Sequence, residues 1–323
     1  MQKLKLLVIA AKDARYLKML DAIAGDVDYQ VTHDAGEAAA WAPEADLILT
    51  GVGASAVVTK AAVDAASKLR WLHSLSAGVD HLMATRLRES DIPVTNAKGA
   101  YSPSLGEYAV ASMLFFAKHV RRLLESQAAG KWDVFDMHML QGKTLGILGY
   151  GDIGKESAKR AKAFGMKIIA LRRRPEKSDG DGIADEIWGM ERKLELMAAS
   201  DYVLLAMPQT PDTKGIVGEA ELRAMKPEGV IINLGRGNAI TETALLQALR
   251  ENWIRGAALD VFEVEPLPDG HEFYRMPNLL LSAHTADHTS TWQEDSMAIF
   301  IENFGRYVKG EPLRNIVDKT VGY

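Results

Sequence analysis

The chain has 323 residues, of which 47% are hydrophobic and 25% charged, and its formal net charge is −5. These values are typical of a soluble globular protein with room for two domains, and the negative charge disfavours nucleic acid or an anionic membrane as a partner. No apolar run approaches the length of a membrane span, and the apolar stretch near the N-terminus is too short for a secretion signal. The absence of cysteine excludes disulfides and thiolate metal sites. We therefore expect a cytoplasmic protein and no metal site.

Residues 1 to about 98 alternate short apolar runs with amphipathic patterns. Strands are expected at residues 4–10, 29–32, 46–50, 71–74 and 94–96, and helices at 14–24 and 55–67. Strands that alternate with helices indicate a parallel sheet covered on both faces. Ser104 and Glu107 then have the spacing of a capping box, which predicts the start of a long helix over 108–124. We place the crossing to a second domain there.

A second α/β array begins at Thr144. Strands are expected at residues 145–148, 167–171, 202–206, 230–233, 257–260 and 279–282, a number that matches two mononucleotide-binding halves. The chain becomes helical again over 291–308, and its tail is expected to return to the first domain.

Three glycines follow the first strand of this array. Gly149, Gly151 and Gly154 form G-x-G-x-x-G ahead of a helical pattern at 155–164 and a second apolar run. In this β-α-β context the first glycine permits a tight turn, the second lets the backbone approach a pyrophosphate, and the third lets helix and strand pack closely. The pyrophosphate would lie on the free N–H groups of the helix N-terminus. The motif predicts dinucleotide binding by Tyr150, Gly151, Asp152 and Ile153.

These patterns predict an α/β fold of two doubly wound parallel-sheet domains. A Rossmann dinucleotide-binding domain (residues 99–292) is inserted in a flavodoxin-like substrate domain (1–98 and 293–323).

Three consecutive arginines, Arg172 to Arg174, follow the second strand of the dinucleotide unit. A dinucleotide with a free ribose 2′-hydroxyl prefers an acidic residue there, whereas arginine suits a 2′-phosphate. Arg172 and Arg173 therefore favour NADP(H), with NAD(H) as the second choice. The alternative is that the arginines form a solvated loop.

Arg236, Glu265 and His284 each follow a predicted strand of the second domain. Ligands of open parallel sheets bind beyond the carboxyl ends of the strands, so these side chains are expected to converge beside the nicotinamide. The set suits hydride transfer to a 2-keto acid: the cation polarises the carbonyl, the imidazolium supplies a proton, and the glutamate keeps the imidazole charged. The alternatives without a catalytic role are that Arg236 lies in a surface turn, that Glu265 is only a charge in a loop, and that His284 is a hydrogen-bonded core residue.

From about residue 45 onward, the chain resembles the D-isomer-specific 2-hydroxyacid dehydrogenases. The resemblance rests on Ser76-Ala-Gly-Val-Asp80, Asn96-Ala-Lys-Gly99, Glu107, the glycine motif, Pro208-Gln-Thr-Pro-Asp-Thr213, Asn233-Leu-Gly-Arg-Gly237, Leu259-Asp-Val-Phe-Glu-Val-Glu-Pro266 and Ala283-His284. It implies that Arg236, Glu265 and His284 are the catalytic set, and that Arg236 and His284 also contact the substrate.

The same resemblance implies further site residues. Ala77 and Gly78 would bind the substrate carboxylate through backbone N–H groups, Asp260 would hold the nicotinamide amide, and Pro208 and Thr213 would line the cofactor site. It also implies a homodimer built on the dinucleotide-binding domains, and an active site in the cleft between domains. The chain departs from the family after His284, where Asp287 and His288 add two titratable groups and leave the substrate open.

The sequence therefore predicts a 2-keto acid reductase that uses NADPH, acts on a small substrate such as glyoxylate or hydroxypyruvate, and yields a D-2-hydroxy acid. A dinucleotide-sensing corepressor of the same fold is the alternative, although such proteins usually carry long disordered extensions. Formate oxidation is a third possibility, and it would need a different substrate loop.

Residues 109–136 are expected to lie against a second subunit, because this stretch is rich in apolar and aromatic side chains: Leu114, Phe115, Phe116, Trp132 and Phe135.

Overall fold

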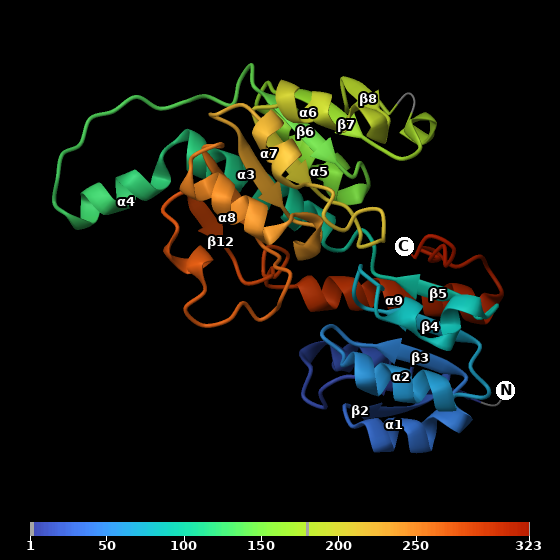
Figure 1. Cartoon of the computed structure of the whole chain (residues 1–323). Coiled ribbons are helices and arrows are strands. Elements are labelled where there is room, and N and C mark those ends of the chain that lie inside the picture. Colours follow the sequence, from blue (N-terminus) through green and yellow to red (C-terminus); the bar gives the residue numbers. More distant parts are fainter. Residues whose placement is uncertain (1–2, 179–180, 323) are drawn as a thin grey trace. The chain divides into compact units, whose positions relative to one another are not determined.

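Two α/β units make up the chain in the computed structural model, which describes residues 3–178 and 181–322 (Figure 1). The first unit contains the residues up to Tyr101 and those from Thr289 onward, and the second runs from Ser102 to His288. The second unit is therefore inserted in the first. The expected boundaries were after residues 98 and 292. The structural ones lie at the start of helix α3 (Ser102–Ala117) and in the turn before α9 (Trp292–Lys309).

The first unit contains a parallel five-stranded sheet with the order β2-β1-β3-β4-β5. This is the flavodoxin-like, doubly wound order, in which the chain reverses direction beside β1. The sequence marks most of these strands as apolar runs because both faces of the sheet are covered. The strands are β1 (Leu4–Ile9), β2 (Val27–Thr32), β3 (Leu47–Thr50), β4 (Trp71–Ser74) and β5 (Val94–Asn96).

Helices cover both faces of this sheet. On one face, α1 (Ala35–Trp41) and α2 (Ala56–Ala65) enclose a core, and on the other α9 packs with the segment η1 (Arg15–Ile23). The α-helix expected over 14–24 is instead 3-10 helix. Its apolar positions Tyr16, Leu20 and Ile23 are nevertheless buried in the core shared with α9.

The second unit contains a parallel seven-stranded sheet with the order β12-β11-β10-β9-β6-β7-β8. Numbered from β6, this is the Rossmann order 3-2-1-4-5-6 with a seventh strand at one edge, so the predicted fold class is confirmed. The strand β8 was missed because it has three residues, two of them half-exposed. The strands are β6 (Thr144–Leu148), β7 (Lys167–Leu171), β8 (Glu186–Trp188), β9 (Tyr202–Leu205), β10 (Val230–Asn233), β11 (Gly256–Leu259) and β12 (Leu279–Leu281).

The helices of this unit include α5 (Asp152–Ala163), α6 (Lys193–Ala199), α7 (Glu219–Ala224) and α8 (Glu242–Arg250). The predicted capping box is wrong, since α3 begins before Ser104, whose hydroxyl instead donates to the Ala286 carbonyl at 2.8 Å.

The single helix expected over 108–124 is also broken. His119 adopts a left-handed backbone (φ 50°), and α4 (Val120–Ala128) follows it. Arg255 donates to the Phe116 carbonyl at 2.5 Å, which satisfies a backbone acceptor at the end of α3. Together with the following segment, α4 projects from the sheet-bearing part of its unit (Figure 1).

Candidate active site

The three glycines of the fingerprint have different surroundings. Gly149 follows β6 with φ 97°, and a Cβ there would lie 2.7 Å from the Ala206 carbonyl oxygen. A Cβ on Gly154 would lie 2.6 Å from the Gly149 carbonyl oxygen, so this residue brings α5 close to the strand. A Cβ on Gly151 would have no atom of the described residues within 4 Å. These surroundings suit a tight turn, helix packing and the approach of a ligand, as the motif requires.

The N-terminus of α5 begins at this open position. Its N-cap is Gly151, which has no side chain to accept from the first N–H groups of the helix. Such a terminus suits a pyrophosphate. Tyr150 is buried, and its hydroxyl lies 3.4 Å from Asp181, which pairs with Lys155 at 3.0 Å. Only the backbone of Tyr150 is therefore suited to phosphate binding.

Arg172 and Arg173 lie at the carboxyl end of β7, beside β6. The Arg172 N–H continues the pairing with β8 by donating to the Trp188 carbonyl at 3.0 Å, which fixes the backbone where the guanidinium begins. The Arg172 side chain is half-buried and Arg173 is exposed. In Rossmann units generally, the end of this strand is where the residue that recognises the adenosine ribose is found.

Arg236 lies in a loop after β10 that packs tightly on its neighbours. Asn233 donates to the Arg236 carbonyl at 3.0 Å and accepts from the N–H of Gly235 at 3.1 Å, which closes the loop. A Cβ on Gly237 would lie 1.9 Å from the carbonyl carbon of Phe262, in the loop that leads to Glu265. The two loops that carry the predicted cation and carboxylate are therefore in direct backbone contact.

Glu265 and His284 form a hydrogen-bonded ion pair, with 2.8 Å between Oε2 and Nδ1. The other carboxylate oxygen accepts from the Phe262 N–H at 2.8 Å. Burial favours the neutral acid, but the bonds from His284 and Phe262 and the charge of Arg236 outweigh it and lower the pKa of Glu265. The hydrogen bond to Glu265 is the largest cause that raises the pKa of His284, against burial and Arg236. The structure thus brings the three predicted catalytic residues into one electrostatic group.

The turn that presents His284 is built on Asp260, which is buried at the end of β11. The His284 N–H donates to the Asp260 carbonyl at 2.8 Å, and the N–H groups of Thr285 and Ala286 donate to its Oδ1 at 2.9 and 3.1 Å. His284 itself has a left-handed backbone (φ 53°), and its side chain is 48% exposed. A strained, exposed histidine fixed by such bonds is typical of a functional residue.

Two residues that the sequence reasoning did not identify support this turn. The Ser282 hydroxyl donates to Asp260 Oδ1 at 2.6 Å, and the Tyr108 hydroxyl donates to Ser282 at 2.6 Å. They escaped notice because their partners lie far away along the chain.

Of the remaining predicted residues, Pro208 and Thr213 lie in the loop after β9. The Thr213 hydroxyl donates to the Pro208 carbonyl at 2.7 Å and accepts from the Thr210 N–H at 2.8 Å, so it closes this loop. Ala77 and Gly78 lie in the first unit, after β4. The Ala77 carbonyl accepts from Asn96 at 2.7 Å, which ties their loop to the end of β5.

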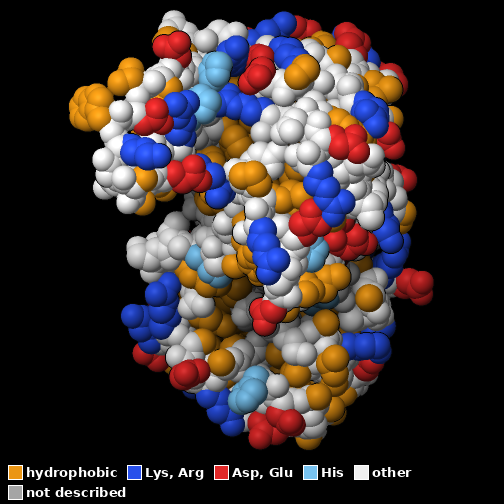
Figure 2. Space-filling view, turned by 60° about the vertical axis from the view of Figure 1, so that its left-hand side comes forward, with side chains coloured by type: hydrophobic (Ala, Val, Ile, Leu, Met, Phe, Trp, Pro, Cys, Tyr) orange, Lys and Arg blue, Asp and Glu red, His pale blue; other side chains and the backbone are white. Residues whose placement is uncertain are grey.

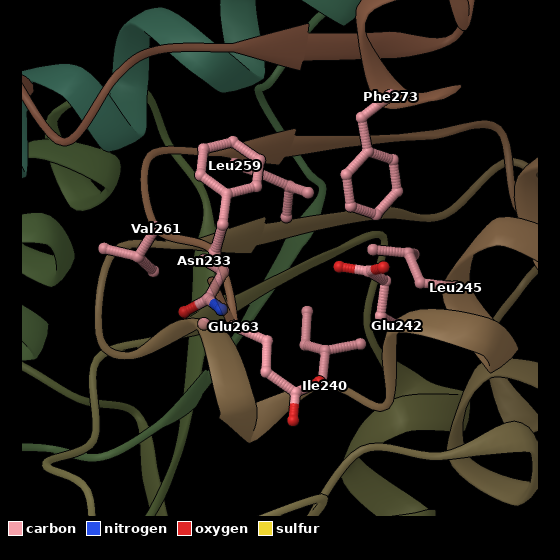
Figure 3. Close-up of a pocket in the computed structure, with 10 residues that line it drawn as sticks. Asn233, Ile240, Glu242, Leu245, Leu259, Val261, Glu263 and Phe273 are labelled. Atoms are coloured by element: carbon pink, nitrogen blue, oxygen red, sulfur yellow. The ribbon is translucent and has the colours of Figure 1, made fainter. Parts of the chain in front are cut away.

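A small cavity lies between the loops after β10 and β11 and helix α8 (Figure 3). Its volume is about 10 Å³, which is too small for an organic ligand, so it reflects packing beneath the Arg236 and Glu265 loops.

Within residues 3–178 and 181–322, no cluster of three or more His, Asp or Glu side chains could hold a metal ion. No helix in those ranges is long and apolar enough to cross a membrane.

Comparison with known proteins gives consistent matches. Residues 110–286 match the family model of the D-isomer specific 2-hydroxyacid dehydrogenase NAD binding domain. The chain is 35% identical over 276 residues to a glyoxylate reductase of Thermococcus litoralis, which covers 82% of this chain and 81% of that protein.

Solved structures agree with this match. A D-isomer specific 2-hydroxyacid dehydrogenase family protein from Aeromonas salmonicida superposes with a TM-score of 0.86 at 29% identity, covering 98% of this chain and all of that one. A D-isomer specific 2-hydroxyacid dehydrogenase from Xanthobacter autotrophicus, in complex with NADPH and MES, gives a TM-score of 0.84 at 26% identity and covers both chains fully.

Proposed function

The chain belongs to the D-isomer-specific 2-hydroxyacid dehydrogenase family, and we propose that it reduces a small 2-keto acid, such as glyoxylate or hydroxypyruvate, to the D-2-hydroxy acid with NADPH. The observation that carries this proposal is the Glu265–His284 ion pair, held at 2.8 Å beside the Arg236 loop. An imidazole kept charged by a carboxylate suits protonation of a carbonyl oxygen.

The protein's part in the reaction follows from these contacts. Because Glu265 occupies Nδ1, the Nε2 of His284 is left for the keto oxygen. His284 donates its proton there as the alcohol forms, and Glu265 stabilises the imidazolium before the transfer. Arg236 polarises the carbonyl and pairs with the substrate carboxylate. The reduced nicotinamide, when bound, supplies the hydride.

The preference for NADPH rests on Arg172 and Arg173 at the end of β7. Each guanidinium can donate to a 2′-phosphate, and a hydrogen bond to a charged group contributes about 1.5–3 kcal/mol. The complex of the Xanthobacter relative with NADPH supports this choice. We further propose that Ala77 and Gly78 bind the substrate carboxylate through backbone N–H groups, and that Asp260, Pro208 and Thr213 contact the cofactor.

The test is a steady-state screen of about ten 2-keto acids with NADPH and with NADH. We expect turnover of at least one small 2-keto acid, with a kcat/KM at least about tenfold higher for NADPH. Arg172→Asp should reverse much of that preference. Equal efficiency with both cofactors, unchanged by the substitution, would refute the choice of cofactor. Tight dinucleotide binding without turnover of any acid would support the sensing alternative instead.

We also propose that the enzyme is a cytoplasmic homodimer. The surface of α4 and the segment after it supports the dimer, because α4 has no buried residue and Trp132 and Val134 are 96% and 82% exposed. Hydrophobic side chains reach the surface beside Lys and Arg in the space-filling view (Figure 2). Phe116, which was expected at this interface, is only 7% exposed and belongs to the core.

The proposed cytoplasmic location is supported by the cysteine content. With no cysteine, the chain needs no oxidising compartment to fold.

A further inference from the structure

Asp287 is an acidic residue that the proposed mechanism leaves unused. It lies three positions after His284, its side chain is 22% exposed, and its Oδ1 is buried. Within the described part of the chain, that oxygen has no hydrogen-bond partner. The imidazole of His288 is 3.7 Å away, beyond hydrogen-bond distance. A buried carboxylate oxygen without such a partner is uncommon and calls for an explanation.

The backbone around Asp287 is firmly held. Asp260 Oδ1 accepts from the N–H groups of Thr285 and Ala286, Ser104 donates to the Ala286 carbonyl at 2.8 Å, and the His288 N–H donates to the Thr285 carbonyl at 3.0 Å. These bonds fix the residues on both sides of Asp287, so its backbone has a defined position relative to His284.

Two imidazoles, one acid and a backbone hydrogen bond act on this carboxylate. Burial is the largest cause that raises the pKa of Asp287, and Asp260 adds to it, whereas His288, His284 and the backbone hydrogen bond oppose it without outweighing burial. The anionic form of Asp287 is therefore poorly compensated. A further anion nearby would worsen this imbalance.

We propose that Asp287 is a specificity-determining residue that discriminates against 2-keto acids carrying a second negative charge. The inference rests on the proposed 2-keto acid reduction. Asp287 is three positions from His284, so their Cα atoms are at most about 11 Å apart, and a substrate that receives the proton of His284 lies within the range of electrostatic interaction with Asp287. Arg236 balances one substrate carboxylate, while a second anionic group would also meet the charges of Asp260 and Glu265. Substrates with a neutral or cationic side chain avoid this repulsion.

The test compares oxaloacetate with its C4 methyl ester, which differ by one negative charge at similar shape. We expect the wild-type kcat/KM with NADPH to favour the ester by roughly tenfold, the factor expected for unit charges about 12 Å apart near a protein surface, and by more if the charges lie closer. Asp287→Asn should lower this ratio, chiefly by lowering KM for the diacid, while the part that is due to Asp260 and Glu265 remains. His288→Gln removes the imidazole nearest to Asp287 Oδ1, at 3.7 Å, which opposes the effect of burial on this carboxylate, and should increase the ratio. Asp136→Asn, on the projecting segment, makes the same change in net charge and should leave it unaltered.

The outcomes separate the two proposals. If the wild type reduces glyoxylate but Asp287→Asn and His288→Gln both keep the wild-type ratio, the role of Asp287 is refuted while the proposed function stands. If the wild type reduces no 2-keto acid with either cofactor, both proposals fail. A lower ratio in Asp287→Asn together with a higher ratio in His288→Gln would establish that the negative charge of this carboxylate discriminates between substrates of different charge.

Discussion

Gly237→Ala tests whether the contact between the Arg236 and Glu265 loops organises catalysis. The added Cβ would lie 1.9 Å from the carbonyl carbon of Phe262, 2.0 Å from its oxygen and 2.5 Å from the Glu263 nitrogen. All three are backbone atoms, so no side-chain rotation relieves the overlap. Ordinary contact begins near 3.4 Å, and one loop must therefore move by about 1.5 Å relative to the other.

That displacement separates Arg236 from the Glu265–His284 pair. A misplacement of about 1 Å costs on the order of 10²-fold in rate, so kcat/KM for the keto acid should fall by at least about that factor. Overpacking costs about 1–3 kcal/mol, which is below the total stability of a typical domain, and the variant should fold. The dissociation constant for NADPH, measured by fluorescence titration, should stay near the wild-type value.

Two other glycines serve as controls. Gly151→Ala places its methyl group in open space at the α5 N-terminus, so it should preserve the fold but weaken NADPH binding. In Gly305→Ala, within α9, the added methyl group also has no atom of the described residues within 4 Å. This variant should be more stable than the wild type by about 1 kcal/mol and should keep the wild-type kcat and KM. Wild-type kcat/KM in Gly237→Ala, or equal loss of cofactor affinity in Gly237→Ala and Gly151→Ala, would refute the assignment of separate roles.

Four further changes are predicted. His284→Ala should lower kcat for reduction by roughly 10²–10⁴ and leave NADPH affinity nearly unchanged in the same titration, whereas a large loss of affinity would point to a structural role. Ser282→Ala breaks the chain from Tyr108 to Asp260 and should lower kcat roughly tenfold, because a hydrogen bond to a charged group is lost; an unaltered kcat would exclude a positioning role. Trp132→Asp should shift the mass from light scattering at micromolar concentration from dimer towards monomer, and a monomeric wild type would contradict the dimer. Gly78→Val should raise KM for the keto acid far more than for NADPH, and equal effects would make its loop a folding element.

The site residues that could be predicted from the sequence are those whose place in the fold depends on residues nearby in the chain. Arg236, Glu265 and His284 follow the apolar strands β10, β11 and β12 within six positions, and parallel strands bring their carboxyl ends to one edge, so apolar runs are sufficient to group them. The glycine fingerprint is equally local. Both predicted sheets are present for the same reason.

The features that were missed depend on distant partners. The break at His119 accompanies a hydrogen bond from Arg255 to the end of α3, more than a hundred positions along the chain, and Ser104 is drawn to the Ala286 carbonyl instead of capping a helix. The support of Asp260 by Ser282 and Tyr108 likewise joins residues that no local pattern connects. The strand β8 lacks an apolar run because it is a short edge strand.

The pH dependence of kcat/KM tests the central claim, that His284 is the proton donor. Reduction needs the imidazolium, so the rate should be highest below the pKa of His284 and fall as pH rises through it. Glu265 raises that pKa, so the fall should come at higher pH than for an ordinary imidazole, and Glu265→Gln should move it to lower pH. The rate of the reverse reaction, oxidation of the hydroxy acid, should instead rise as pH increases through the same pKa, because it needs the neutral imidazole to accept the proton. A wild-type profile that persists in His284→Ala but disappears in His288→Ala would contradict the assignment and make His288 the donor.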